Sequence, residues 1–205
     1  MTVRVALTFD AEHPDRPAPA GNAEALLRVL AHRSVRATFF VQGRWAEAYP
    51  ETARAIADSG HLVGHHSHYH ARLPLLTDAG IAEDIRDGEA AIRASTGRDP
   101  APWFRCPFGA GADDPRVRTA IGAAGYRHVG WHVAADDWEP AHSGAFVADA
   151  VLRGVEAHGD GAVVLLHTWP SATLGAIEPI LDGLAAGGVE PCRLDELADV
   201  PAEVP

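Results

Sequence analysis

The sequence contains no lysine, because all 17 of its basic residues are arginines. A P-loop needs a lysine to reach the nucleotide phosphates, and a pyridoxal enzyme needs a lysine for its Schiff base. The absence of lysine therefore excludes both classes of enzyme. Only two cysteines occur, Cys106 and Cys192, which are too few for a zinc-finger framework. Their spacing does not require a disulfide bridge, and a bridge between Cys106 and Cys192 stays an open alternative.

The chain also lacks a run of about eighteen apolar residues, so the sequence predicts no membrane-spanning helix. Its first residues lead directly into a strand pattern and lack the basic start, apolar core and cleavage site of a signal peptide. We therefore expect a cytoplasmic protein. The formal charge is −11 at pH 7, and an acidic chain repels phosphate backbones and anionic lipid. We expect neither nucleic acid nor a membrane as a partner.

Strand patterns and helix patterns alternate along the chain without a linker, a repeat or a low-complexity tract, so the sequence predicts one domain over residues 1–205. Continuous apolar strands joined by helices are typical of a parallel sheet that is covered on both faces. We therefore predict an α/β fold, either a distorted barrel of seven βα units or an open doubly wound sheet. The predicted strands are residues 3–9, 37–41, 61–65, 103–105, 126–131, 162–166 and 189–194. The predicted helices are a first one capped by Asn22, then residues 44–59, 77–96, 114–125, 146–157 and 173–186.

Polar side chains gather at the predicted carboxyl ends of the strands, where α/β folds build their active sites. Asp10 and Glu12 follow the first strand and, being two residues apart, point to the same side of it. His66 and His70 follow the third strand. On a helical turn, side chains four residues apart face the same way and can grip one metal ion, and Gly64 allows a tight turn before them.

A divalent metal held by two neutral histidines needs an anionic third ligand if the site is to be catalytic and keep an open position. Either Asp10 or Glu12 could supply that ligand, and the other carboxylate would be left as a general base beside the metal. His65 and His68 lie on other sides of the same turn, and we expect them to support it.

Three more polar residues lie at or after strand ends. His167 ends the most apolar strand and has a side-chain pKa near neutrality, which suits a proton donor opposite the base. Arg105 could hold a carboxylate through two hydrogen bonds, and Asp137 could orient His167 and keep it protonated. A buried structural histidine and a structural salt bridge are the plainer alternatives at these positions.

Taken together, these stretches resemble the polysaccharide deacetylase family, whose NodB homology domain defines family 4 of the carbohydrate esterases. The resemblance covers nearly the whole chain, and the order of several motifs makes it specific where one motif alone would not. The matching residues are Thr8-Phe9-Asp10, Ala37-Thr38-Phe39-Phe40-Val41, His66-Ser67 with His70, Arg105-Cys106-Pro107-Phe108-Gly109, Asp137-Trp138 and Leu165-Leu166-His167.

The resemblance implies a distorted barrel that hydrolyses N-acetyl groups on amino sugars with Zn²⁺ or another divalent ion such as Co²⁺, Ni²⁺ or Mn²⁺. By motif, Asp10 matches the family's catalytic base and Arg105 the residue that holds this base. His167 matches the family's general acid, and Asp137 matches the residue that partners this acid. His66 and His70 match the family's metal ligands. The resemblance also implies a substrate site, to which we assign Phe108, Trp138 and Leu165.

Three departures from the family pattern stand out. Family members commonly carry a second aspartate on the metal where this sequence has Ala11, which cannot bind a metal ion. A variant branch has an acidic residue one place further on, so we assign the third metal ligand to Glu12. Ala134 stands where an aspartate is usual, and Cys106 replaces a usual proline, which would place a thiol near the metal. The departures suggest a substrate other than ordinary chitin or peptidoglycan.

We therefore expect a metal-dependent amide hydrolase that removes N-acetyl groups from an amino sugar, an oligosaccharide or a related small N-acyl substrate. Two alternatives stay open. The missing second aspartate favours a hydrolase of cyclic amides or ureides, similar to an allantoinase. An inactive carbohydrate-binding barrel is the other alternative, in which Ala11 would mark a lost ligand, although retention of the other motif residues argues against it.

Overall fold

A computed structural model describes residues 2–15 and 19–201. Its strands are β1 (Val3–Ala11), β2 (Thr38–Val41), β3 (Leu62–His65), β4 (Trp103–Phe104), β5 (Arg127–His128), β6 (Val133–Ala134), β7 (Val163–His167) and β8 (Val189–Cys192). Its helices are α1 (Asn22–His32), α2 (Gly43–Ala48), α3 (Pro50–Asp58), α4 (Asp78–Thr96), α5 (Pro115–Ala123), α6 (Gly144–His158) and α7 (Ser171–Ala186). Three single turns of 3₁₀ helix are Leu73–Leu75, Pro107–Gly109 and Leu194–Glu196.

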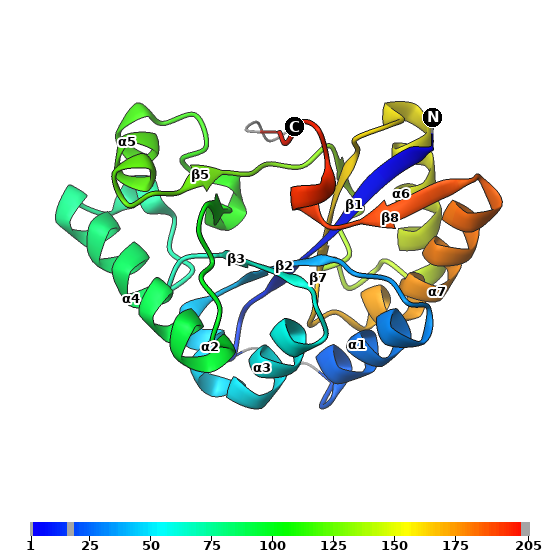
Figure 1. The fold of residues 1–205 in the computed structure, drawn as a ribbon, viewed down its shortest axis with the longest axis horizontal. Coiled ribbons are helices and arrows are strands. Elements are labelled where there is room, and N and C mark those ends of the chain that lie inside the picture. The colour runs from blue at the N-terminus through cyan, green and yellow to red at the C-terminus, as the bar shows by residue number, and fades with distance from the viewer. Residues whose placement is uncertain (1, 16–18, 202–205) are drawn as a thin grey trace.

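The strands form one curled parallel sheet in the order β5-β4-β3-β2-β1-β7-β6, with β8 paired to the first half of β1 (Figure 1). Among the described residues the outer strands β5 and β6 do not pair with each other. The α/β prediction is therefore confirmed, and the barrel is a half-barrel that stays open on one side.

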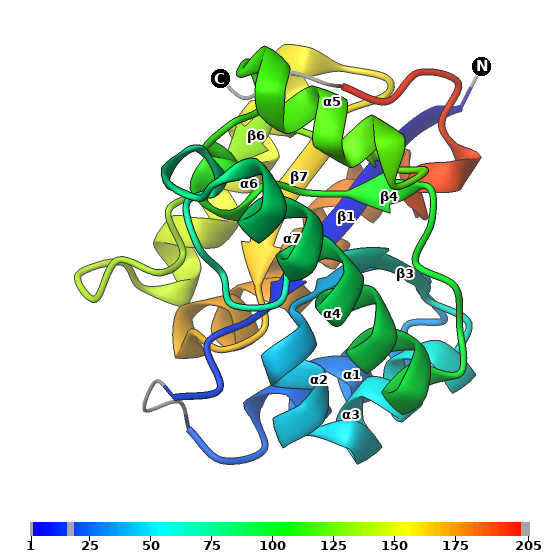
Figure 2. The same cartoon turned by 90° about the vertical axis from the view of Figure 1, so that its left-hand side faces the viewer.

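Helices cover the outside of this curled sheet. The largest apolar cluster joins β1, β2 and β7 to α1, α3, α6 and α7, and Figure 2 shows α4 and α5 across the side formed by β3 and β4. Burial of apolar side chains supplies the main favourable free energy of folding, about 1.5–3 kcal/mol for each large residue. No helix in the described ranges is long and apolar enough to cross a membrane.

Strand β1 lies at the centre of the sheet and determines where the polar residues meet. In the parallel register Asp10 lies opposite Phe40 of β2 and His167 of β7. His65, at the end of β3, lies opposite Val41 of β2 and Phe104 of β4. Because all the strands run the same way, their carboxyl ends open onto one face of the half-barrel.

Helix α4 shows how the sequence directs a polar side chain inward. Thr77 caps the helix by accepting a hydrogen bond from the Gly80 N–H at 3.1 Å, and Gly97 ends it with a φ of 69°. Ile81 and Ile85 form part of its buried stripe, and Asp84 lies on the same face and is 2% exposed. The helix therefore points one carboxylate at the sheet.

Two predicted elements are wrong in their extent. The helix expected over residues 44–59 is divided into α2 and α3 at Pro50, which has no N–H to continue the first helix and starts the second one. The strand expected over residues 126–131 is only the two residues of β5, and β6 follows beyond its predicted end. The sequence did not predict β6, which makes eight strands among the described residues where seven were expected.

Two single-residue expectations are also corrected. Asn22 is not the cap of α1 but its first residue, and its side-chain amide donates to the carbonyls of Thr168 and Pro170 at 2.8 and 3.1 Å. This amide ties the start of α1 to the segment after β7. Cys106 and Cys192 are both free and buried, so the disulfide that the sequence left open is absent.

Candidate active site

The predicted site residues meet in one cavity of about 510 Å³ at the carboxyl ends of β1, β3 and β7. Eight of the ten predicted residues line it directly, and the other two, Arg105 and Asp137, lie behind Asp10 and His167. Convergence from strands far apart in the sequence is the result that parallel topology predicts. The lining residues are Asp10, Glu12, His13, His66, His70, Cys106, Phe108, Trp131, Trp138, Leu165, His167 and Trp169.

Glu12, His66 and His70 form a cluster that could hold a metal ion. Oε2 of Glu12 lies 3.0 Å from Nε2 of His66 and also contacts Nε2 of His70. All three side chains are at least nine-tenths buried. One carboxylate oxygen and two imidazole nitrogens are donors that suit Zn²⁺ and related divalent ions.

The hydrogen bonds of His66 define which ring nitrogen faces the cluster. Its Nδ1 lies 2.9 Å from the carbonyl oxygen of Arg105, which accepts a hydrogen bond from it. In a neutral ring Nε2 then carries the lone pair, directed at Glu12. Two acceptors at 3.0 Å need a proton or a cation between them. The donor set therefore fits a metal ion.

The charges in the cluster also favour a bound cation. Burial tends to raise the pKa of Glu12, but hydrogen bonds from His13, His66 and His70 outweigh burial and hold that pKa well below its ordinary value. Burial tends to lower the pKa of His66, whereas the nearby carboxylates of Asp10 and Glu12 raise it overall. The cluster thus carries an ionised carboxylate and attracts positive charge.

The histidines are brought together by a loop and not by the helical turn that the sequence predicted. Ser67 and His70 have positive φ angles of 61° and 58°, and Oγ of Ser67 accepts from the His70 N–H at 2.9 Å. Gly64 makes no turn. It lies within β3, where a Cβ would come within 2.7 Å of the Phe40 ring, so close packing requires the glycine.

Asp84 of α4 holds this loop in place. Its two carboxylate oxygens accept hydrogen bonds from the backbone N–H groups of His68 and Tyr69, both at 3.0 Å. His65 supports the loop as expected, since Nδ1 accepts from the Ser67 N–H at 2.9 Å and Nε2 lies 2.8 Å from the Ile85 carbonyl. Asp84 could not be singled out from the sequence, because a carboxylate on a polar helix usually faces solvent.

Asp10 is fixed by Arg105 from behind. Nη1 of Arg105 donates to Oδ1 of Asp10 at 2.8 Å and to Oγ1 of Thr8 at 2.9 Å, and Nη2 donates to the Gly130 carbonyl at 3.1 Å. Arg105 is fully buried. The other oxygen of Asp10, Oδ2, lies 3.5 Å from Nε2 of His66. Asp10 therefore borders the cluster with one oxygen held and the other directed toward it.

His167 borders the cluster next to Glu12. Its Nδ1 lies 2.7 Å from Oδ1 of Asp137, and its Nε2 lies 3.8 Å from Oε1 of Glu12. Burial alone would lower the pKa of His167, but the charge of Asp137 and the hydrogen bond to it raise that pKa to about 9. The cavity thus holds a carboxylate and a protonated imidazole beside the cluster.

Apolar and aromatic side chains form the remaining wall. The Trp138 ring lies 5.2 Å from the His167 ring, and the half-exposed Phe108 lies 4.5 Å from the His70 ring at the cavity edge. Leu165 is 4% exposed and lines the cavity floor. Burial raises the pKa of Cys106 to about 12, so its thiol stays protonated and is a poor metal ligand.

Three residues that were not predicted as site residues also contact the cluster or its loop. Nε2 of His13 lies 3.0 Å from Oε1 of Glu12, and Nε1 of Trp169 donates to the same oxygen at 3.3 Å. Gln42 accepts from the His13 N–H at 2.9 Å and donates to the His68 carbonyl at 3.1 Å. Gln42 directly follows β2, so inspecting every strand end would have found it.

Comparison with known proteins gives consistent matches. The model of the polysaccharide deacetylase family matches residues 2–129. A chitooligosaccharide deacetylase of Sinorhizobium fredii is 35% identical over 80% of this chain and 71% of its own length. A peptidoglycan-N-acetylglucosamine deacetylase of Listeria monocytogenes is 31% identical over 95% of this chain, which spans only 38% of that protein.

The structural comparison agrees with the sequence comparison. A family 4 carbohydrate esterase from Streptomyces lividans, solved in complex with acetate, superposes with a TM-score of 0.80 at 33% identity. The match covers 92% of this chain and 91% of that one. The sequence, the fold and the motif residues agree, and the chain belongs to the polysaccharide deacetylase family, a family of metal-dependent hydrolases of non-peptide carbon–nitrogen bonds.

Proposed function

We propose that this protein removes the acetyl group from an N-acetylated amino sugar, in an oligosaccharide or a related small N-acyl substrate, and releases acetate. The observation that carries the proposal is the placement of Asp10 and His167 beside the Glu12, His66 and His70 cluster, with Asp10 next to His66 and His167 next to Glu12. Amide hydrolysis needs a proton acceptor and a proton donor on the two sides of the scissile carbon. The names of the two relatives, both deacetylases of N-acetylated glycans, support the same substrate class.

Glu12, His66 and His70 would hold the metal ion, and we propose Zn²⁺ because three nitrogen and oxygen ligands with an open position are typical of catalytic zinc. When bound, such an ion polarises a carbonyl oxygen and lowers the pKa of water. The ionised Glu12 supplies the negative charge, and the hydrogen bond from His66 to the Arg105 carbonyl orients the ring.

Asp10 would act as the general base. Arg105 and Thr8 lie behind it and hold the carboxylate in one orientation, with Oδ2 toward the cluster. The buried guanidinium also places a positive charge directly beside this carboxylate. Asp10 can therefore take the proton of the attacking water, and a fixed orientation avoids the entropic cost of arranging it during the reaction.

His167 would act as the general acid. A pKa of about 9 keeps its ring protonated at neutral pH, and its Nε2 lies 3.8 Å from Oε1 of Glu12 at the edge of the cluster. It can donate a proton to the amine nitrogen as the carbon–nitrogen bond breaks. Without this proton the nitrogen would leave as a strongly basic anion, which blocks cleavage.

The wall of the cavity suits an acetyl group. Leu165 offers an apolar surface for the methyl group, and Trp138 packs beside His167. Phe108, half-exposed at the rim, can contact the sugar ring. Ala11 is fully buried in the apolar core, and Glu12 occupies a ligand position. The departure at residue 11 therefore leaves the ligand set complete, which speaks against an inactive barrel.

A substrate panel tests this function. Zinc-loaded protein should release acetate from N-acetylglucosamine oligomers and should not open the rings of allantoin or hydantoin. The Asp10→Asn variant should lose about 10²–10⁴-fold in acetate release, the usual share of general acid–base catalysis. Ring opening without acetate release would replace the proposal by the cyclic-amide alternative. Zinc binding without either reaction would favour the carbohydrate-binding one.

A further inference from the structure

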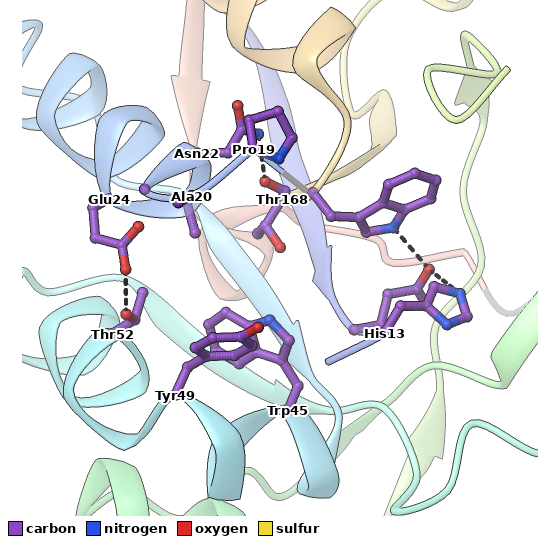
Figure 3. A pocket seen from close by; sticks show the side chains of 13 residues that line it. His13, Pro19, Ala20, Asn22, Glu24, Trp45, Tyr49, Thr52 and Thr168 are labelled. Atoms are coloured by element: carbon purple, nitrogen blue, oxygen red, sulfur yellow. Dashed lines mark hydrogen bonds and ion pairs between the residues drawn. The ribbon is translucent and has the colours of Figure 1, made fainter. Parts of the chain in front are cut away.

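A second cavity of about 110 Å³ lies beside the candidate active site (Figure 3). Glu12, His13 and Trp169 line both cavities, so these residues form a shared wall. We call the second cavity the side pocket. Its other lining residues come from the segment before α1, the first turn of α1, α2 and α3 with the residue between them, and the end of β7: Pro19, Ala20, Gly21, Asn22, Ala23, Glu24, Trp45, Tyr49, Thr52 and Thr168.

Thr168 presents a polar atom without a partner to the side pocket. The residue is 1% exposed, and its Oγ1 has no hydrogen-bond partner among the residues that the structure describes. Figure 3 shows the Thr168 side chain directed into the space toward Trp45 and Tyr49. A buried hydroxyl that lacks a partner costs about 1–3 kcal/mol. This position therefore favours a bound group that can accept or donate a hydrogen bond.

The start of α1 adds backbone donors to the same space. Gly21 is the N-cap of this helix of 11 residues, and no described side chain caps it. The first N–H groups of a helix have no partner within the helix, and the first-turn residues Ala23 and Glu24 line the side pocket. The pocket thus offers hydrogen-bond donors from the backbone as well as the Thr168 hydroxyl.

The charges at the pocket indicate an uncharged ligand. Glu24 borders it, with Oε1 accepting from Oγ1 of Thr52 at 2.6 Å (Figure 3), and Glu12 borders it from the side of the active site. Two carboxylates repel an anion, whereas the positive end of the helix dipole repels a cation. A hydroxyl or an amide suits the pocket, because each can donate to a carboxylate and accept from an N–H or hydroxyl group.

The size and the aromatic walls narrow the ligand further. One water needs about 10–15 Å³ of such volume, so 110 Å³ accommodates a group of several heavy atoms but not a whole sugar ring. Trp45, Tyr49 and Trp169 provide apolar surface with polar tips, which suits carbohydrate. These features fit an exocyclic arm of a sugar, an acetamido or a hydroxymethyl group.

We propose that the side pocket binds the uncharged exocyclic arm of the sugar unit next to the one being deacetylated. This inference rests on the proposed function, because the shared wall of Glu12, His13 and Trp169 places the pocket directly beside the acetyl-binding cavity. The substrate is then a chain of at least two sugar units, and a single N-acetylglucosamine leaves the pocket empty.

Two variants of the side pocket test this inference by calorimetric binding to zinc-loaded protein. Thr168→Val keeps the shape of the side chain and removes only its hydroxyl. It should weaken binding of N,N′-diacetylchitobiose about 3- to 10-fold, the share of one hydrogen bond. Ala20→Phe places a ring at the exposed edge of the pocket. This variant should weaken binding of the disaccharide at least as much as Thr168→Val does. Neither variant should change the affinity for N-acetylglucosamine to the same degree.

Thr96→Val is the matched control. Thr96 is equally buried, lies in α4 outside the pocket, and donates to the Ile92 carbonyl at 2.7 Å. This control should lower Tm and leave both sugar affinities unchanged. Thr168→Val should not lower Tm, because its hydroxyl has no partner to lose. The two threonines thus separate a stability effect from a binding effect.

The outcomes distinguish the two proposals. An unchanged ratio of disaccharide to monosaccharide affinity in both pocket variants overturns the side-pocket inference, even if acetate is released. A selective loss of disaccharide affinity without any acetate release supports the pocket and overturns the proposed function. Absence of binding to either sugar overturns both.

Discussion

Asp137 holds His167 at two points. One carboxylate oxygen lies 2.7 Å from Nδ1 of the ring, and the other accepts the backbone N–H of His167 at 2.8 Å. Thr173 of α7 donates to the same carboxylate. The double contact fixes the ring relative to its own backbone, so Nε2 is directed into the cavity with no freedom to turn away.

The first prediction concerns the pH dependence of the Asp137→Asn variant. With Asp137 ionised, the pKa of His167 is raised to about 9, so the acid form is present below that pH and is lost as the pH rises through it. Neutral asparagine removes the largest effect that opposes burial and leaves only the smaller effects of Glu12 and Asp10, which lowers this pKa. The basic limb of the kcat profile should move to lower pH, with a loss of at least about 10²-fold at pH 8.

Asp136→Asn is the control for that profile. Asp136 is adjacent and exposed, and its substitution should leave the basic limb where it is in the unmodified protein. A basic limb that stays in place in Asp137→Asn would show that His167 is not the group that controls it.

The second prediction separates the metal ligand from the base. Glu12→Gln removes the negative charge between His66 and His70, so the purified variant should retain much less than one equivalent of zinc. Asp10→Asn should keep about one equivalent of zinc and lose its activity. Metal content measured by inductively coupled plasma mass spectrometry shows which of the two carboxylates binds the zinc. Zinc lost from Asp10→Asn and kept by Glu12→Gln would exchange the two roles.

The third prediction concerns two glycines within helices. A Cβ on Gly88 of α4 would lie 2.6 Å from Cε1 of His65 and 3.0 Å from the Ser67 backbone, whereas one on Gly122 of α5 would meet nothing within 4 Å. Gly122→Ala should therefore stabilise by about 0.5–1 kcal/mol through helix propensity. Gly88→Ala should destabilise by about 1–3 kcal/mol because of overpacking.

Urea unfolding at neutral pH measures both changes. The histidine loop adds a second measurement, since a shift of His65 should also reduce zinc affinity in Gly88→Ala and leave it unchanged in Gly122→Ala. Equal effects of the two substitutions on stability would mean that the helix α4 contact with the loop is not tight.

The fourth prediction concerns stability in acid. Burial lowers the pKa of His65 to about 3, and burial together with Arg193 and Arg36 lowers that of His61 to about 4. Both rings are neutral in the folded protein at pH values where the unfolded chain binds protons. Their contribution is complete above about pH 6.5 and is lost as the pH falls toward 3–4.

The midpoint of urea unfolding of the metal-free protein should therefore be lower at pH 5 than at pH 7.5. His61→Gln should reduce this pH dependence, and His32→Gln, at an exposed site on α1, should preserve it. A pH dependence that is the same in His61→Gln as in the unmodified protein would contradict the neutral state of the buried His61 ring.

The sequence predicted the location of the site because the relevant signal is local. Asp10, His66 and His167 each follow a strand that the apolar pattern identifies, and parallel strands bring their ends together. The two-residue spacing of Asp10 and Glu12 also predicted that both carboxylates face the cavity. The one-domain organisation and the cytoplasmic location stay predictions.

Other features depend on contacts between distant segments, which a single sequence does not record. Asp84 supports the histidine loop from α4, and Gln42 joins the ends of β1 and β3. The side chain of Asn22 looks like a helix cap but reaches across to the segment after β7. Pro50 was the one local signal that could have predicted the break between α2 and α3.

Strand β1 carries Asp10, is followed directly by Glu12, and has paired neighbours along its whole course. The position of Asp10 is therefore set by an interior strand, and Glu12 lies one residue beyond the last paired residue, Ala11. Loops around the rim, including those that shape the side pocket, can lengthen, shorten or change composition without moving one carboxylate relative to the other. Substrate preference in such a scaffold is free to diverge while the chemistry stays constant.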